Sequence, residues 1–175
     1  MKQIALALLL ALSSSCGFGQ DFFDSIFAKY SGQSNVVSIS IGKDLLKLAA
    51  SMDSSSEAQE SVNKLHELKI LVRSNENKAS ITEQTFTGDV LSFVEKSDYL
   101  KLIEVVDSDT KLNFYAKKSG KTITHLVMVG GESGEEILLS LKGDFTTKDL
   151  VTIGKNGGSD GLSHLAKLKT LEEKH

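Results

Sequence analysis

The sequence predicts an α+β domain in which helices pack on one face of a mainly antiparallel sheet. Four strand-like segments follow one another between residues 100 and 142 with turn signals between them, the pattern of an antiparallel meander. Apolar residues earlier in the chain recur at helical spacing. Residues 20–153 have the length of one domain and contain no cysteine, so packing alone must stabilise it.

Residues 1–19 have the pattern of a cleavable signal peptide. Lys2 supplies the basic end, and residues 4–12 form an apolar run. That run is too short to span a bilayer as a helix, which takes about 20 apolar residues. The sequence therefore predicts export, and it offers no transmembrane helix in the mature chain.

Two processing routes are compatible with this signal. Small residues at Gly17 and Gly19 favour cleavage after Gly19, which makes Gln20 the new N-terminus. Cys16 is the alternative, because a cysteine directly after an apolar run can become the lipidated first residue of a lipoprotein. The serines before Cys16 favour simple secretion. We expect a periplasmic or secreted protein, with lipid anchoring in the cell envelope through Cys16 as the alternative.

The first half of the domain is predicted to mix helices with strands. Apolar residues at helical spacing predict helices over three segments, and β-branched or apolar runs predict two strands. The predicted helices span 21–30, 43–52 and from the serines 54–56 to about 65, and the predicted strands span 36–41 and 68–73.

The second half begins with an amphipathic helix over 82–96, in which Phe86, Val90, Phe93 and Val94 share one face. The meander follows, and Thr146 or Thr147 caps a short helix that runs to Ile153. The predicted strands of the meander span 100–106, 112–117, 122–129 and 136–142.

The chain ends in a glycine-rich linker, 154–161, and a C-terminal amphipathic helix, 162–175. The helix presents a slanting stripe of leucines that forms a candidate interaction surface. We expect the stripe to pack on the domain's own sheet, with a partner protein and then a membrane surface as the alternatives. The stripe consists of Leu162, Leu165, Leu168 and Leu171.

Several segments together resemble a known family. Phe27 and Tyr30 precede the strand 36–41, and the turn 141–144 precedes a short terminal helix. With Lys43, Leu45, Leu48 and the segments 99–103, 114–117 and 126–129, they resemble the domain of unknown function 4252 family of small exported proteins from Gram-negative bacteria. The resemblance implies an exported helix-on-sheet domain of unassigned biochemistry, and it offers no catalytic residues.

No catalytic motif withstands comparison with a simpler structural reading. Gly120-Lys121-Thr122 copies the end of a phosphate-binding loop but lacks the earlier glycine and the following helix. The glycines of 130–134 stand between two strands and are typical of a turn. No serine lies in a nucleophile elbow. The paired carboxylates Glu135-Glu136 and Glu172-Glu173 are adjacent and point apart, so neither forms a glycosidase pair.

The candidate metal ligands are too few. Asp107 and Asp109 form one cluster of oxygens, whereas calcium takes six to eight ligands. The histidines lack the spacing that places two ligands on one helical face. His125 lies between Thr124 and Leu126, and we expect it on the solvent face of a half-buried strand. The other candidate oxygens are Asn156, Ser159 and Asp160, and the other histidines are His66, His164 and His175.

These exclusions favour a non-catalytic binding or structural module of the cell envelope over an enzyme. We expect no cofactor and no metal, and the partner is an unknown protein or envelope component. The net charge of −3 and the absence of a basic cluster speak against nucleic acid. A hydrolase-like periplasmic enzyme with an unrecognised site is the alternative.

Overall fold

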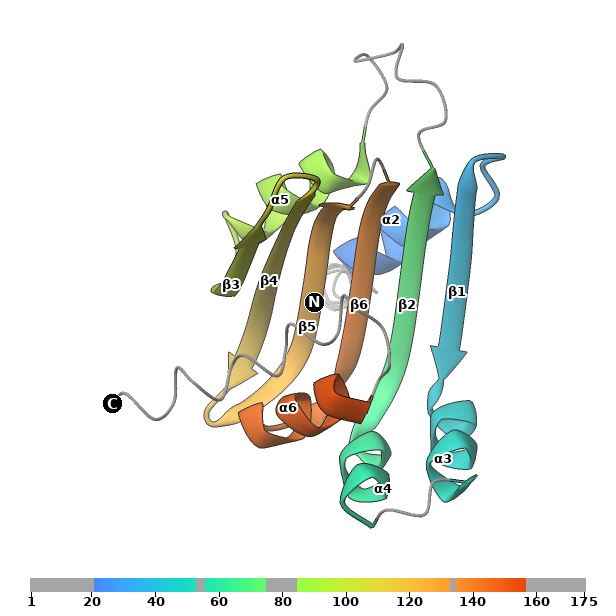
Figure 1. Ribbon diagram of the computed structural model, residues 1–175, viewed down its shortest axis with the longest axis vertical. Coiled ribbons are helices and arrows are strands. Elements are labelled where there is room, and N and C mark those ends of the chain that lie inside the picture. Colours follow the sequence, from blue (N-terminus) through green and yellow to red (C-terminus); the bar gives the residue numbers. More distant parts are fainter. Residues whose placement is uncertain (1–20, 53–55, 75–84, 133–134, 157–175) are drawn as a thin grey trace, which may run out of the picture.

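A computed structural model describes residues 21–52, 56–74, 85–132 and 135–156. Its centre is one six-stranded sheet in the order β1-β2-β6-β5-β4-β3, in which every neighbouring pair is antiparallel (Figure 1). The α+β class with an antiparallel sheet is confirmed. The strands are β1 (Val36–Gly42), β2 (Leu65–Ser74), β3 (Leu100–Val106), β4 (Thr110–Ser119), β5 (Thr122–Glu132) and β6 (Glu135–Phe145).

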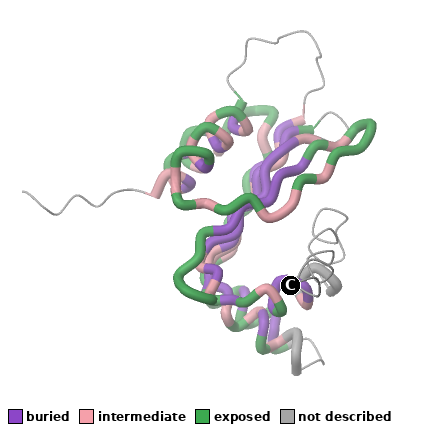
Figure 2. The backbone as a smooth tube through the Cα atoms, turned by 90° about the vertical axis from the view of Figure 1, so that its left-hand side faces the viewer, coloured by how far each residue is buried: buried purple, intermediate pink, exposed green. Residues whose placement is uncertain are grey.

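Side chains alternate along each strand and give the sheet two apolar faces. On β5, Leu126 and Met128 belong to one buried cluster, and Val127 and Val129 belong to the other. Figure 2 shows buried residues concentrated along the middle of the sheet. A sheet that is apolar on both sides must be covered on both sides.

The helices, which we expected on one face, lie on both. Residues of α2 (Phe22–Tyr30) and α5 (Phe86–Val94) pack in the cluster of Val127 and Val129. Residues of α3 (Lys43–Met52), α4 (Ser56–Asn63) and α6 (Thr147–Asn156) pack in or against the opposite cluster. The physical reason is the uninterrupted apolar run 126–129, which an alternating one-sided strand does not have.

The element bounds agree with the sequence prediction at most positions. Strand 100–106 coincides with β3, whereas β2, β4, β5 and β6 are each longer than predicted, because the hydrogen-bonded ladders continue past the apolar runs. Helix α6 continues to Asn156, so the predicted linker does not begin at residue 154. The signal segment 1–19, Gln20 and the C-terminal helix 162–175 lie outside the described residues.

Local sequence explains how α2 and α5 begin. The carboxylate of Asp21 accepts a hydrogen bond from the Phe23 N–H at 3.0 Å and caps α2. The hydroxyl of Thr85 accepts one from the Gly88 N–H at 3.3 Å and caps α5. Both caps satisfy N–H groups that have no partner within the helix. None of the described helices is long and apolar enough to cross a membrane.

Candidate functional site

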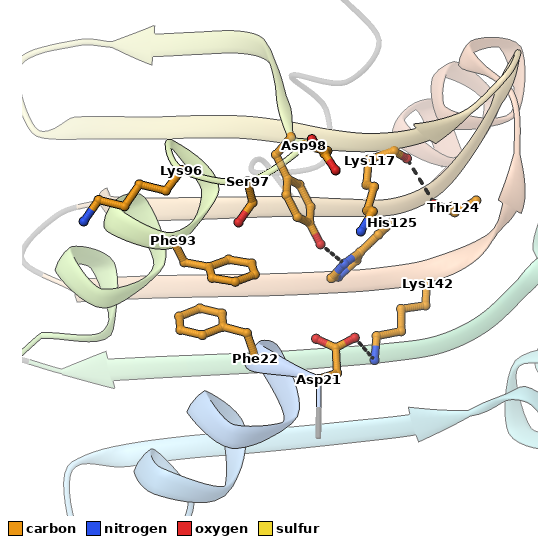
Figure 3. Close-up of a pocket in the computed structure, with 11 residues that line it drawn as sticks. Asp21, Phe22, Phe93, Lys96, Ser97, Asp98, Lys117, Thr124, His125 and Lys142 are labelled. Atoms are coloured by element: carbon orange, nitrogen blue, oxygen red, sulfur yellow. Dashed lines mark hydrogen bonds and ion pairs between the residues drawn. The ribbon is translucent and has the colours of Figure 1, made fainter. Parts of the chain in front are cut away.

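A cleft of about 610 Å³ opens between the start of α2, the end of α5 and strands β4, β5 and β6 (Figure 3). Polar and charged side chains from these elements converge on it, while two phenylalanines form an apolar wall. Clefts of this size that combine an apolar wall with a few polar groups are typical of small-molecule sites. The lining residues are Asp21, Phe22, Phe93, Lys96, Ser97, Asp98, Tyr99, Lys117, Thr124, His125 and Lys142.

His125 lies at the inner end of the cleft and joins two hydroxyl groups. Its Nδ1 is 2.6 Å from the Tyr99 hydroxyl oxygen, and its Nε2 is 2.8 Å from the Ser140 hydroxyl oxygen. The ring also packs edge-on against Phe23, with 4.6 Å between the ring centroids. His125 is only 5% exposed, and both of its ring nitrogens have partners within the protein.

Burial sets the charge of this network. Removal from water lowers the pKa of His125 to about 4, because the charged imidazolium loses more hydration than the neutral ring. Burial also raises the pKa of Tyr99, and the negative charge of Asp21 raises it further. His125 and Tyr99 are therefore both neutral at pH 7. A neutral imidazole has one donor and one acceptor nitrogen. Each of these nitrogens can therefore form a hydrogen bond with one of the two hydroxyl groups, Tyr99 or Ser140.

An ion pair closes the side of the cleft next to α2. Lys142 Nζ lies 2.9 Å from an oxygen of Asp21, the residue that caps α2. Burial alone would raise the pKa of Asp21, but the hydrogen bonds from Lys142 and from the Phe23 N–H lower it below its ordinary value. Asp24 and Glu67 also lie within 4 Å of Lys142. The charge of Lys142 is therefore already neutralised.

Two other lysines of the cleft have no acidic partner among the described residues. Neither Lys96 nor Lys117 forms an ion pair with another described residue, and Lys117 Nζ lies 6.0 Å from the ring centroid of Tyr99. The apolar wall opposite consists of the stacked rings of Phe22 and Phe93, whose centroids are 3.9 Å apart and whose planes differ by 6°. The cleft thus combines cationic groups with an aromatic wall.

The sequence prediction for His125 is corrected by this geometry. We expected the side chain on the solvent face of β5, but it is buried on the same face as Val127 and Val129. The other site members were not predicted, because Tyr99, Lys117 and Lys142 come from separate elements. The one available signal was the spacing of His125 from those two valines, two and four residues away.

A second hollow, of about 640 Å³, contains the predicted calcium candidates Asp107 and Asp109. Both stand in the turn between β3 and β4, where an Asp107 oxygen accepts a hydrogen bond from the Ser108 N–H at 2.7 Å. Gly130, Gly131 and Glu135 also line this hollow. Among the described residues, no group of three or more acidic, histidine or cysteine side chains is arranged to hold a metal ion.

A buried ion pair lies beside this second hollow. Arg73 and Glu136 are 3% and 6% exposed, and Arg73 Nη1 lies 3.6 Å from Glu136 Oε2. The guanidinium carbon is 5.0 Å from the ring centroid of Tyr30 and 5.5 Å from that of Phe86. The other Glu136 oxygen accepts the Thr87 N–H at the start of α5. The pair therefore fixes α5 against the sheet.

The remaining sequence candidates fall in turns or outside the structure. Gly120 has a φ of 60° in the turn between β4 and β5, so Gly120-Lys121-Thr122 is a hairpin turn without a following helix. His66 is partly exposed on β2, with Nε2 3.4 Å from Asp144. Glu135 is exposed and Glu136 is buried, as expected for adjacent strand residues. Ser159, Asp160, His164, His175, Glu172, Glu173 and the four leucines lie outside the described residues.

The sequence of this domain matches one known protein family. The sequence profile described as "Domain of unknown function (DUF4252)" matches residues 30–153. The chain belongs to this family. The match to DUF4252 includes every described strand and all of the cleft except Asp21 and Phe22. No curated protein and no solved structure matches the chain.

Proposed function

We propose that this DUF4252 protein is an exported component of the cell envelope that acts by binding a small aromatic or apolar anion in the His125 cleft. The observation that carries the proposal is the pairing of an aromatic wall, the stacked rings of Phe22 and Phe93, with two lysines that have no acidic partner among the described residues. An apolar or aromatic ligand packs against these two rings, and its anionic group meets Lys96 or Lys117.

Anilinonaphthalene sulfonate is a suitable probe, because it joins a planar apolar body to one negative charge. We expect Phe93→Ala to weaken its binding roughly tenfold, the equivalent of about 1.4 kcal/mol. We expect Lys117→Gln to weaken binding and to reduce its dependence on salt. Fluorescence titration measures both effects.

The matched control is Lys118→Gln, which removes the same charge from the next residue of β4, an exposed position that does not line the cleft. It should bind the probe like the unchanged protein. Equal affinities for the unchanged protein, Phe93→Ala and Lys117→Gln would place the probe elsewhere and contradict the proposed cleft.

The proposed location in the cell envelope is supported by the sequence of residues 1–19. Protein recovered from its host should start at Gln20 or at a lipidated Cys16, and intact mass distinguishes the two. Recovery of a cytoplasmic product that retains Met1 would contradict export and leave the binding experiment unaffected.

A hydrolase is the second candidate, on one specific observation. Ser140 Oγ lies 2.8 Å from His125 Nε2, within reach for proton transfer from a nucleophile to a base, and Tyr99 orients the other nitrogen. However, Ser140 is 3% exposed and does not line the cleft. A fluorophosphonate reagent that labels the unchanged protein but not Ser140→Ala would favour the hydrolase. Absence of labelling would favour binding.

A further inference from the structure

The two edges of the sheet differ in how they are protected. β1 and β3 are the edge strands, and an edge strand exposes N–H and C=O groups that can pair with another chain. β3 carries Lys101 and Glu104, which form an ion pair at 2.8 Å, and its register shifts between Lys101 and Ile103. Charges and a bulge are the usual protection against pairing.

β1 has none of this protection. Its sequence, Val-Val-Ser-Ile-Ser-Ile-Gly, contains no charge and no proline, and all seven residues pair with β2 in unbroken register. Val37 is 61% exposed and Ile39 is 42% exposed. Of the six large apolar side chains that are exposed among the described residues, four lie on β1 or in the helix directly after it: Val37, Ile39, Leu45 and Leu48.

Hydrogen bonds fix which backbone groups of β1 point outward. The Ser74 N–H donates to the Asn35 carbonyl at 3.2 Å, and the Val36 N–H turns away to donate to Gln33 at 3.1 Å. Because an antiparallel strand alternates its bonding side, the N–H and C=O groups of Ser38 and Ser40 point away from β2. No other described strand pairs with this outer side.

We infer that β1 is a homodimer interface, in which β1 of a second copy of this chain adds antiparallel to the sheet across a two-fold axis at Ile39. Ser38 exchanges both backbone hydrogen bonds with Ser40 of the partner subunit, and Ser40 does so with Ser38 of the partner subunit. This register pairs the whole strand and keeps the outward groups opposite one another.

The side chains fit the same register. Val37, Ile39 and Ile41 share one face of β1, where Val37 meets Ile41 of the partner subunit and Ile39 meets its own copy. β1 contains no charged residue, so no like charges oppose one another across the axis. A strand pair buries less area than a permanent dimer requires, so we expect monomer and dimer in concentration-dependent exchange.

Cysteine cross-linking tests the register. The experiment uses the full chain, in which Cys16, its one native cysteine, is changed to Ser so that each variant carries a single cysteine. Across the axis, the Cα atoms of Ile39 lie about 4.5 Å apart, within the range of about 4.4–6.8 Å that a disulfide spans. Ile39→Cys should form a covalent dimer under mild oxidation. Val37→Cys is the matched control, because it is more exposed on the same strand face but lies about 14 Å from its own copy, four residues at 3.4 Å.

Sedimentation velocity provides an independent readout. The weight-average sedimentation coefficient of the unchanged protein should rise with concentration. Ile39→Lys, which places two like charges on the axis, should remain monomeric. Val106→Lys on the other edge, where Val106 is 68% exposed, should behave like the unchanged protein. A monomer at all concentrations, or equal cross-linking at positions 37 and 39, overturns the inference.

Discussion

Replacing His125 with glutamine should remove a specific acid sensitivity from the protein. In the folded state, burial lowers the pKa of His125 to about 4, whereas an unfolded chain returns it to about 6.5. Between these values the unfolded state binds a proton that the folded state excludes. Stability is therefore complete above pH 6.5 and falls as the pH drops toward 4.

The size of the effect follows from the two pKa values. Each unit of difference corresponds to roughly 1.4 kcal/mol. Between pH 7.5 and pH 4.5, His125 alone should lower the free energy of unfolding by about 2.5 kcal/mol.

Urea denaturation at the two pH values measures the loss, and the same experiment on His125→Gln provides the reference. Glutamine keeps one donor and one acceptor for Tyr99 and Ser140 but cannot take up a proton. Groups that titrate in both proteins contribute equally, so the difference between the two proteins isolates the contribution of His125. An equal loss of stability in both proteins would show that His125 is not held neutral by burial.

Three further outcomes test the packing and the turns. Gly130→Ala should destabilise the fold by about 3 kcal/mol in urea melts, because a Cβ there would lie 1.9 Å from the Lys111 carbonyl oxygen, whereas Gly42→Ala should change stability by less than about 0.5 kcal/mol because nothing lies within 4 Å. Glu136→Leu should cost about 3 kcal/mol, since it leaves the buried charge of Arg73 without its carboxylate, and a cost near zero would contradict the role of this pair. Chelators should leave the thermal midpoint unchanged, and a drop of several degrees that calcium restores would contradict the prediction that Asp107 and Asp109 bind no metal.

The sequence contained most of the information on the elements because the relevant signals are local. β3 was predicted at its observed bounds from one apolar run between turn residues. The placement of the helices on both faces depends on the strand segment 126–129, whose side chains are buried on both sides of the sheet. An apolar run of four residues predicts this only when its alternate members are assigned to opposite faces. The alternation can be read from the sequence, but the helices that cover each face cannot.

The candidate site was less predictable, because its members meet only through the fold. Asp21 is the first residue of the predicted helix 21–30, but its pairing with Lys142 depends on the fold bringing the start of α2 to β6. Tyr99 follows α5 directly, and no local pattern connects it with a histidine on β5. Periodicity alone would have placed His125 beside Val127 and Val129, and its flanking residues misled the prediction.

The position of β2 between β1 and β6 has a consequence for how the chain folds. β3 to β6 are joined by short turns, and β1 and β2 by two helices, so each group closes over short sequence distances. Pairing of β2 with β6 must instead bring together segments separated by α5 and three strands, and such distant contacts form slowly. We expect two locally ordered halves that become one cooperative unit only when Ile70 meets Leu139 along this seam. During synthesis, the first half must therefore wait, with its apolar surface exposed, until the last strand has emerged.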